Sequence, residues 1–280
     1  MIKVALPNKG VLFEPTIELL SSCGYRASRA GGQLLSFDPE NEVEFYFLRP
    51  GDIPLYVANG ILDAGITGKD FVVEKGLTPR LLLDLHYGQS RLCAAVAMSS
   101  SVTTLEDVAN LRIATSFPTI TRRAFPAREI DIVELEGAVE IAVQLGIAEA
   151  VVDVVETGTT LRQAGLRVVG EPLFVSNAAL FAHPGREALG GVMILKTRIE
   201  GRIVALEYLM VEYDCPAAVL GRASEITPGI ESPTIAPLQA EGWYSVKAMI
   251  RRSEANRVMD DLSRAGCKGI LLMSIESARI

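Results

Sequence analysis

Short apolar runs alternate with amphipathic segments through about the first 200 residues of the chain. The apolar runs are rich in Val, Ile and Leu and have the length of strands, with glycine, proline or charged residues at their ends. They predict strands at residues 2–6, 43–48, 64–67, 111–114, 150–155 and 166–169. Between them the periodicity predicts helices that end at a glycine, for example 53–59 before Gly60 and 139–145 before Gly146. This alternation is typical of an α/β fold, and we expect mostly parallel strands.

Two stretches of the chain resemble one another. Residues 60–64 read Gly-Ile-Leu-Asp-Ala, and residues 146–150 read Gly-Ile-Ala-Glu-Ala. Both continue through a predicted strand to a Thr-Gly pair, at 67–68 and at 157–158. We expect two similar α/β lobes, each with a Thr-Gly turn and a helix start at the strand end, where α/β sheets bind ligands. A chance similarity between two helix–glycine–strand units is the alternative.

The pattern changes after about residue 200. Strands are predicted at 205–214, 244–250 and 268–275, and helices at 216–224 and 254–265. The second helix has Ser253 as its expected N-cap and Gly266 just past its end. Prolines in residues 227–238 exclude a regular central strand there. The order of elements predicts a separate α+β unit of the split βαβ, ferredoxin-like kind.

Composition narrows the function classes. The chain is 49% hydrophobic and 22% charged, which is typical of a globular protein. A net charge of -7 argues against broad binding to nucleic acid or to anionic membranes, because both favour a basic face. The apolar runs are too short for a membrane span, and no signal-peptide pattern opens the chain, so we expect a cytoplasmic protein. Widely spaced cysteines and only two histidines argue against a zinc site.

The segment 151–161 carries the clearest chemical signal. An apolar strand leads into a hydroxyl-rich turn, Glu-Thr-Gly-Thr-Thr, that begins a helix. Backbone N–H groups at a helix start, a glycine that permits close approach and threonine hydroxyls all suit a phosphate. Asp153 and Glu156 at the strand end suit ribose hydroxyls. The combination describes a 5-phosphoribosyl group, and a helix with an ordinary threonine cap is the alternative.

This segment resembles the phosphoribosyl pyrophosphate loop of the ATP phosphoribosyltransferase family. Further blocks match that family in order along almost the whole chain, at 6–10, 49–54, 63–70, 113–123 and 135–140. Residues 213–216 and 231–238 resemble the regulatory domain of the long form, and of actinobacterial members in particular. The resemblance implies a two-lobed, periplasmic-binding-protein-like catalytic region and a C-terminal ferredoxin-like (ACT-like) regulatory domain. The expected boundaries are 1–88 with 178–204 for lobe I, 89–177 for lobe II and 205–280 for the regulatory domain.

The resemblance also implies the reaction. A phosphoribosyltransferase of this family, which is a glycosyltransferase, moves the 5-phosphoribosyl group from phosphoribosyl pyrophosphate to N1 of ATP and releases pyrophosphate, in the first step of histidine biosynthesis. Positioning and charge neutralisation should dominate such a displacement, so no protein nucleophile is required. Mg²⁺ is expected to arrive with the substrate phosphates. Feedback inhibition by histidine and a homo-oligomer, from dimer to hexamer, are implied as well.

The family match assigns site residues in three groups. Phosphoribosyl pyrophosphate is expected at Asp153, Glu156, Thr157, Gly158, Thr159, Thr160 and Leu161, with Lys9 near the leaving pyrophosphate. Binding of ATP, or of substrate more generally, is expected at Arg49, Asp52, Gly65, Thr67, Gly68, Asp70, Arg122, Glu136 and Gly137. The effector histidine is expected at Asp214, Ser232 and Thr234. Structural alternatives stay open: a solvated Lys9, an Arg49–Asp52 ion pair that caps a helix, and an exposed basic helix start at 121–123. The adenine contacts stay open too, because Thr119 and the segment 86–88 depart from the family pattern.

Two other functions suit a two-lobed chain of this length. Prephenate dehydratase joins similar lobes to a small regulatory domain but needs no phosphate loop, so the blocks at 63–70 and 156–161 argue against it. A solute-binding protein uses the same clamp without chemistry. Such proteins are usually exported, and the lack of a signal-peptide pattern argues against this function.

Overall fold

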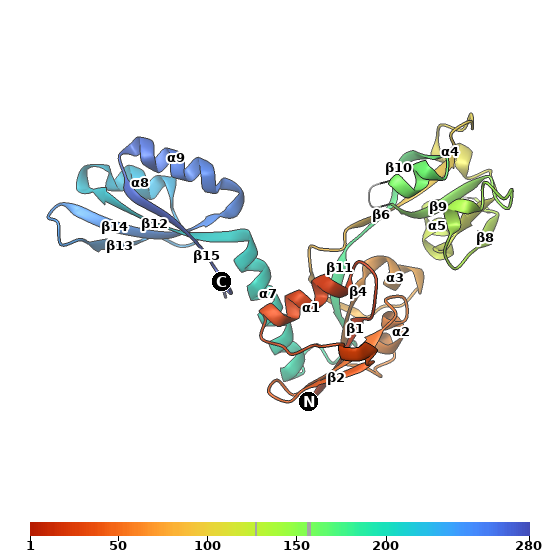
Figure 1. The fold of residues 1–280 in the computed structure, drawn as a ribbon, viewed down its shortest axis with the longest axis horizontal. Helices are drawn as coiled ribbons and strands as arrows, with labels where there is room; N and C mark the ends of the chain where they lie inside the picture. Colours follow the sequence, from red (N-terminus) through yellow and green to blue (C-terminus); the bar gives the residue numbers. More distant parts are fainter. Residues whose placement is uncertain (127, 156–157) are drawn as a thin grey trace. The chain divides into compact units, whose positions relative to one another are not determined.

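The computed structural model describes residues 1–126, 128–155 and 158–280 and divides into two compact units (Figure 1). The first unit comprises Met1–Ser21 with Tyr25–Lys196, and the second comprises Ser22–Gly24 with Thr197–Ile280. Across the described ranges, no helix combines the length and the apolar character needed to cross a membrane.

A six-stranded mixed sheet with its helices forms the first lobe of unit 1. The strand order is β2-β3-β1-β4-β11-β5. The strands are β1 (Ile2–Pro7), β2 (Leu35–Asp38), β3 (Val43–Leu48), β4 (Ala64–Gly68), β5 (Arg80–Asp84) and β11 (Ala178–Ala182). The helical elements are α1 (Phe13–Ser22), η1 (Ala30–Gly32), α2 (Ile53–Ala58) and α3 (Lys69–Glu74). Strands β3, β1 and β4 are parallel, so their carboxyl ends meet at one edge.

A five-stranded sheet with its helices forms the second lobe of unit 1. The strand order is β10-β6-β9-β7-β8. The strands are β6 (Ser90–Ala97), β7 (Ile113–Thr115), β8 (Ile132–Glu134), β9 (Ala150–Val155) and β10 (Leu166–Ser176). The helical elements are α4 (Leu105–Val108), α5 (Pro118–Ala124), η2 (Val139–Ile141) and α6 (Thr159–Gln163). Strands β9, β7 and β8 are parallel, and a buried apolar cluster covers each face of the sheet.

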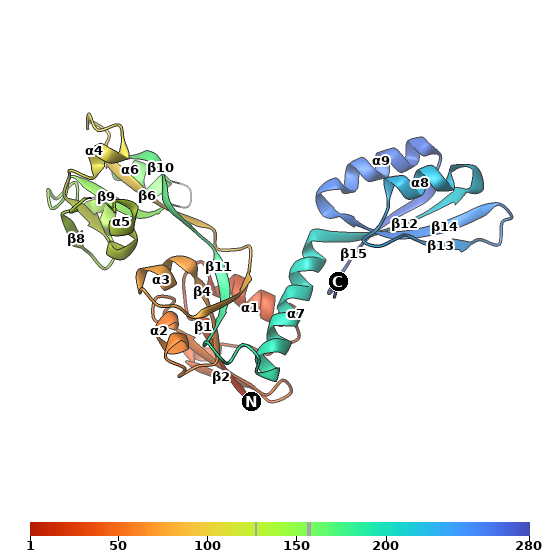
Figure 2. The same ribbon diagram turned by 180° about the vertical axis from the view of Figure 1, so that it is seen from behind.

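The chain passes between the two lobes at two adjacent places. Strand β10 of the second lobe is separated from β11 of the first lobe by Asn177 alone, and Figure 2 shows this extended segment entering both sheets. The other crossing lies between β5 and β6, beside the first. Tyr87 accepts a hydrogen bond from the backbone N–H of Ala178 at 2.9 Å, and the Asn177 amide donates to Asp84 at 3.0 Å.

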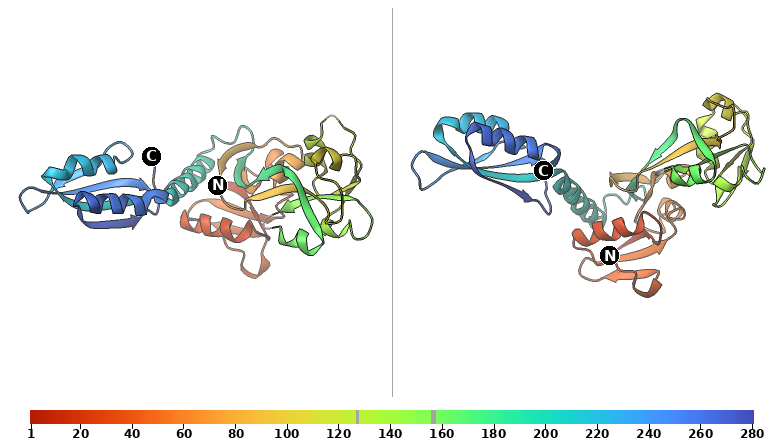
Figure 3. Two further views of the ribbon diagram at one scale, coloured as in Figure 1. Left: turned by 90° about the horizontal axis from the view of Figure 1, so that it is seen from above. Right: turned by 45° about the horizontal axis from the view of Figure 1, so that its top comes forward.

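The second unit holds a four-stranded antiparallel sheet of order β13-β14-β12-β15. Helix α7 (Gly190–Glu207) begins in unit 1 and leads into β12 (Tyr208–Pro216), η3 (Ala217–Val219), α8 (Leu220–Ile226), β13 (Thr234–Pro237), β14 (Trp243–Arg251), η4 (Arg252–Glu254), α9 (Ala255–Ala265) and β15 (Lys268–Ser274). Helices α8 and α9 lie side by side over one face of the sheet (Figure 3). Alternate residues of β12, among them Val211 and Tyr213, are buried against them. This is the expected ferredoxin-like arrangement.

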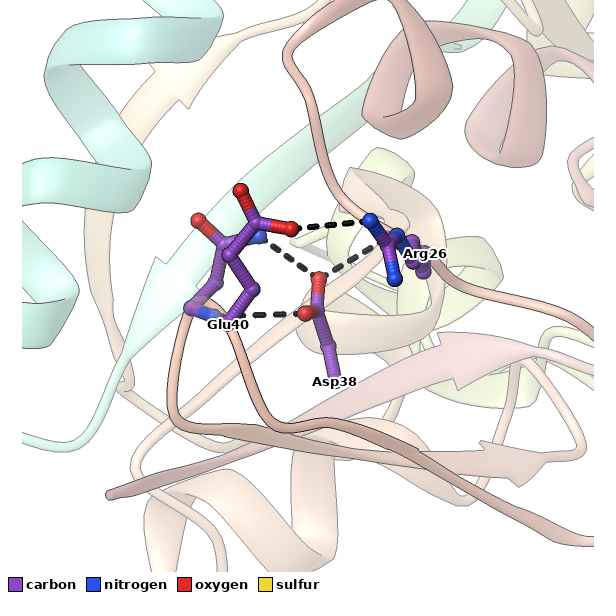
Figure 4. A network of polar contacts seen from close by, with 4 residues as sticks. Arg26, Asp38 and Glu40 are labelled. Atoms are coloured by element: carbon purple, nitrogen blue, oxygen red, sulfur yellow. Dashed lines mark hydrogen bonds and ion pairs between the residues drawn. The ribbon is translucent and has the colours of Figure 1, made fainter.

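A buried carboxylate closes the hairpin between β2 and β3 (Figure 4). Asp38 is 0% exposed and accepts hydrogen bonds from the backbone N–H of Arg26 at 2.8 Å and of Asn41 at 3.2 Å, and from the Asn41 amide at 2.7 Å. Burial by itself would raise the pKa of this carboxyl, but the bonds from Arg26 and Asn41 outweigh burial and lower the pKa. The neighbouring Arg26–Glu40 ion pair is exposed, and exposed ion pairs contribute little to the free energy of unfolding. We therefore expect Asp38 to contribute more to stability than this ion pair.

The expectation of mostly parallel strands is wrong for the first unit, whose two sheets are mixed. Parallel neighbours need a long crossover, whereas a short link returns the chain antiparallel. The hairpin from β2 to β3 is such a link, and the segments that cross between the lobes likewise enter beside antiparallel neighbours.

Several predicted boundaries differ from the structure, and three of the differences have a local cause. The helix expected at 139–145 is a 3₁₀ turn at Val139–Ile141, because Ala138 has a left-handed φ of 50° and offers no capping side chain, and β-branched residues follow. Ser253 is not an N-cap: it lies inside η4, and α9 begins after Glu254. The strand expected from residue 205 starts at Tyr208, since α7 continues to Glu207.

Candidate functional site

Three loops of the first lobe begin at the carboxyl ends of β1, β3 and β4, which lie together at one edge of the sheet. Residues 8–10 follow β1, residues 49–52 follow β3, and α3 begins directly after β4. Hydrogen bonds tie the loops together. Asn8 N–H donates to the Leu48 carbonyl at 2.8 Å, and the Thr67 hydroxyl donates to the Pro50 carbonyl at 2.7 Å. The structure therefore brings the predicted substrate residues of this lobe to one edge.

Cationic side chains gather in these loops. Lys9 and Arg49 are exposed, and neither has an acidic partner in the part of the chain that the structure describes. An Arg49–Asp52 ion pair is absent from the same part, and Asp52 precedes α2 without a side-chain capping bond. The two cations are thus available to an anionic ligand, and the ion-pair alternative is not realised.

Arg29 joins this edge from a distant segment, and sequence reasoning missed it. Its Nη1 donates to the backbone carbonyl of Asn8, 21 residues earlier, at 2.7 Å. The Nε of Arg29 and the Oδ1 of Asn8 are buried and have no hydrogen-bond partner among the described residues. No local motif marks Arg29, because its role comes only from the folding of the segment after α1 over the β1 loop.

The turn between β4 and α3 is built from buried side chains. Thr67 is 1% exposed and its hydroxyl is used by Pro50, while Asp70 is 7% exposed and accepts from the Ser176 hydroxyl at 2.9 Å. Burial raises the pKa of the Asp70 carboxyl, although bonds from Ser176 and Phe71 oppose the rise. A Cβ on Gly65 would lie 2.8 Å from Ile53 Cγ2. These predicted ligand residues therefore form the framework of the turn, with their side chains directed into the protein.

The second lobe has a matching edge at the carboxyl ends of β7, β8 and β9. Ser116, just after β7, donates from its hydroxyl to the Leu135 carbonyl at 2.6 Å and accepts from Gly137 N–H at 3.3 Å. This places the predicted residues Glu136 and Gly137, both exposed, beside the end of β7. Sequence reasoning did not select Ser116.

Asp153 near the end of β9 is partly buried. Burial raises the pKa of its carboxyl, the hydrogen bond from Val154 N–H at 2.8 Å opposes the rise, and the Glu140 carboxylate adds to it. Two carboxylates thus influence one another at the end of the strand. A cation or a hydrogen-bond donor such as a ribose hydroxyl would relieve their repulsion.

The hydroxyl-rich turn follows β9. Gly158 has a left-handed φ of 73° and is the N-cap of α6, Thr159 and Thr160 are exposed in the first turn, and Leu161 is 4% exposed in the core of the lobe. The Leu161 side chain therefore anchors the turn in the core of the lobe. Glu156 and Thr157 lie outside the described residues.

Helix α5 carries the last predicted ATP residue. Arg122 is exposed, whereas its neighbour Thr121 is 0% exposed and donates to the Phe117 carbonyl at 2.8 Å. Phe117, the N-cap residue of α5, makes no side-chain capping bond. Arg122 is thus the accessible cation of the 121–123 segment nearest the helix start.

The three predicted effector residues are not in contact within unit 2. Asp214 lies on β12 and Thr234 on the edge strand β13, with β14 between them. Two strand spacings separate them by about 10 Å. The row that contains Thr234 also holds the Glu212–Lys247 ion pair at 3.2 Å, and Ser232 is exposed before β13. A ligand at Asp214 therefore does not reach the other two side chains through this sheet alone.

The described side chains at the end of β9 suit a metal ion that arrives with its substrate. Across residues 1–126, 128–155 and 158–280, no group of three or more His, Cys, Asp or Glu side chains has a metal-binding arrangement. Mg²⁺ usually takes one or two carboxylates and completes its shell with substrate phosphates and water. Asp153 with Glu140 nearby fits that limited role.

Comparison with known proteins gives consistent matches over the chain. The family described as ATP phosphoribosyltransferase matches residues 49–201, and the one described as HisG, C-terminal domain, matches residues 205–277. Proteins named ATP phosphoribosyltransferase are similar over 100% of both chains, with 44% identity in Salinibacter ruber, 43% in Streptomyces avermitilis and 43% in Mycobacterium tuberculosis.

Solved structures agree with the sequence matches. A chain of the ATP phosphoribosyl transferase (HisG:HisZ) complex from Thermotoga maritima superposes with a TM-score of 0.61 at 26% identity, covering 71% of this chain and 96% of that one. The substrate-binding protein of an amino acid ABC transporter shares the fold alone, with a TM-score of 0.50 at 13% identity, covering 73% of this chain and 93% of that one.

Proposed function

The chain belongs to the ATP phosphoribosyltransferase family, and on this premise we propose that the two loop edges of unit 1 bind its two substrates. The Gly158–Leu161 turn with Asp153 receives phosphoribosyl pyrophosphate, and Arg49, Arg122 and the 136–137 loop face ATP. The observation that carries this assignment is a turn with two exposed threonines, Thr159 and Thr160, beside a partly buried carboxylate at the end of the central strand β9. Neither prephenate dehydratase nor solute binding is retained, because the family matches cover both parts of the chain.

The side chains suit a displacement at a sugar carbon. Adenine N1 forms a bond to ribose C1 as the bond to pyrophosphate breaks, so negative charge grows on the leaving group. Lys9 and Arg49 are exposed cations without acidic partners in the described structure, and Arg29 lies beside Lys9. Preorganised charges of this kind lower the barrier more than the same charges in water. The hydroxyls of Thr159 and Thr160 would hold the 5-phosphate.

Mg²⁺ would supply charge neutralisation to the pyrophosphate when bound. Asp153 is the protein ligand that we assign to this ion or to the ribose hydroxyls. Gly65, Thr67, Gly68 and Asp70 support ATP binding through backbone position, since Thr67 and Asp70 already use their side chains internally. Asp52 is exposed beside the Arg49 loop and can accept from a substrate hydroxyl.

Regulation and assembly are further parts of the proposal. We assign residues 1–88 with 178–204 to lobe I, 89–177 to lobe II and 205–280 to the regulatory domain. Histidine would inhibit through Asp214, with Ser232 and Thr234 contributing from another surface. The Thermotoga maritima neighbour is part of a HisG:HisZ complex. The present chain carries its own C-terminal HisG domain. We propose that it assembles with copies of itself, from dimer to hexamer, and that it acts in the cytoplasm.

The test of the site is Thr160→Val, which preserves shape but removes the hydroxyl. The KM for phosphoribosyl pyrophosphate should rise about tenfold through loss of a hydrogen bond to a charged group, while the KM for ATP stays the same. Thr104→Val is unsuitable as a control because Thr104 caps α4, so the exposed Thr103→Val serves instead. Unchanged kinetics in Thr160→Val would remove the turn from the substrate site.

A further inference from the structure

Helix α3 packs into both lobes of unit 1. Val72 is buried in the apolar cluster of the first lobe, whereas Phe71 and Val73 pack against the cluster of the second. The Phe71 ring lies 6.0 Å from the Phe117 ring, centroid to centroid, at the start of α5. Since α3 begins directly after the Thr67–Gly68 turn, one short element connects a proposed substrate turn to the opposite lobe.

Glu74, the last residue of α3, caps α5 from the other lobe. Its Oε1 accepts from Thr119 N–H at 2.9 Å, and its Oε2 accepts from Ile120 N–H at 3.0 Å. Phe117 supplies no capping side chain, so the first turn of α5 relies on a carboxylate 45 and 46 residues earlier in the chain. Hydrogen bonds to an ionised carboxylate are the stronger kind, and negative charge is favoured at a helix start.

The two bonds add direction that apolar packing lacks. Phe117 and Ile120 fix the buried side of α5, at 6% and 3% exposure, but hydrophobic burial is non-directional and permits rotation of the helix. Two N–H groups bound to the two oxygens of one carboxylate restrict that rotation. Arg122 follows in the next turn and is exposed. The two hydrogen bonds from the N–H groups of residues 119 and 120 to Glu74 therefore restrict the direction in which the Arg122 side chain leaves the helix.

We propose that Glu74 is a positioning residue for ATP: it aligns α5 so that Arg122 faces the nucleotide held beside the Thr67–Asp70 turn. The proposal rests on the proposed function, namely on Arg122 and that turn as ATP contacts. Both oxygens of Glu74 are occupied by α5 N–H groups, so Glu74 acts through the helix and does not touch substrate.

The decisive variant is Glu74→Gln, which has nearly the same shape but turns an NH₂ group toward one of the two N–H donors. The KM for ATP should rise on the order of tenfold, while the KM for phosphoribosyl pyrophosphate changes less than about twofold. The control is Lys75→Gln, because Lys75 is the next residue and is exposed. It should leave both KM values unchanged. Thermal unfolding of all three proteins is followed alongside.

A rise in the KM for ATP without a matching rise in the KM for phosphoribosyl pyrophosphate distinguishes a positioning role of Glu74 from a contribution to overall stability. An equal rise in both values, or a lower melting temperature with an unchanged KM for ATP, would overturn the proposal. If Glu74→Gln does not fold, Glu74→Asp, which keeps the charge on a shorter side chain, replaces it with the same expected split. Calorimetry with ATP alone keeps the two hypotheses apart. Wild type that binds ATP but forms no product when phosphoribosyl pyrophosphate and Mg²⁺ are also supplied contradicts the proposed function. The ratio of ATP affinities between wild type and Glu74→Gln still tests Glu74.

Discussion

At the scale of single residues, burial separates the predicted site side chains into two groups. Thr67 and Asp70 are buried and bonded inside the first lobe, whereas Lys9, Arg49 and Arg122 are exposed cations. Family resemblance located both groups in the sequence, because it marks positions and not roles. The division between buried, internally bonded side chains and exposed ones appears only with the fold, since it depends on partners such as Ser176 that lie 106 residues away.

Gly158 provides the first residue-scale prediction. Gly158→Val places a branched residue at a φ of 73°, which costs about 1–2 kcal/mol, and puts a side chain where phosphate should approach the backbone. Gly146→Val carries a similar strain at a φ of 67° but lies outside the site, where a Cβ would meet no atom within 4 Å. Calorimetry should show lost binding of phosphoribosyl pyrophosphate in Gly158→Val alone. Equal affinity in the two variants would make the turn an ordinary helix cap.

Asp38 provides a pH-dependent prediction. Its pKa is lowered in the folded protein, so its contribution to the free energy of unfolding is present above the unfolded value of about 3.9 and is lost as the pH falls through the lower folded value. At pH 7, Asp38→Asn should therefore destabilise the protein by about 1.5–3 kcal/mol. Urea unfolding at several pH values should show this difference shrinking below about pH 4. A difference that stays constant from pH 7 to pH 3 would contradict this role.

At the scale of helices and strands, the sequence pattern predicted best those strands whose ends are marked by neighbouring residues in the chain. The strands Val43–Leu48 and Ala150–Val155 were predicted with their observed bounds, because continuous apolar runs with clear ends identify buried strands. The sequence analysis names no helix at α7, which begins with Gly190 and Gly191, a residue type that disfavours helices. A Cβ on Gly191 would lie 2.7 Å from Ile2 Cγ2, so packing requires this glycine. Contacts between distant elements, such as Glu74 with α5, have no local signal.

The packing of α2 on β4 yields an element-scale prediction. A methyl group on Gly65 would lie 2.8 Å from Ile53 Cγ2 and 2.9 Å from Val57 Cγ2, so Gly65→Ala should cost about 1–3 kcal/mol through overpacking. Adding Val57→Ala removes one of the opposed methyl groups. Chemical denaturation should show that the double variant loses less stability than the sum of the two single variants. Strict additivity would mean that α2 and β4 do not share this contact.

At the scale of the whole molecule, two units with different sheet patterns share one chain. Unit 1 carries the two loop edges, and unit 2 is the antiparallel HisG C-terminal domain. An effector in unit 2 can influence catalysis only by binding one conformational state better than another. The predicted change in pattern near residue 200 lies close to Thr197, where the longer segment of unit 2 begins. The separation of Asp214 from Thr234 by β14 has no local signal, because strand order is a tertiary property.

Histidine inhibition is the prediction at this scale. Asp214→Ala should weaken inhibition roughly ten- to over a hundredfold through loss of a charge-assisted contact, while uninhibited turnover stays nearly intact. Asp260→Ala removes an exposed carboxylate from α9 of the same unit and serves as the control. Histidine titrations at identical substrate levels decide the matter. Identical curves for wild type and Asp214→Ala would move the effector site elsewhere.

The most direct test of the central claim is ultraviolet monitoring of the purified protein with ATP, phosphoribosyl pyrophosphate and Mg²⁺, because alkylation at N1 changes adenine absorbance. We expect the absorbance change only when both substrates and the divalent cation are present, together with equimolar release of pyrophosphate. Excess chelator should abolish it, since the leaving group carries several negative charges that this acidic chain does not neutralise alone. Pyrophosphate release without an N1 adduct, or full turnover in chelator, would contradict the account.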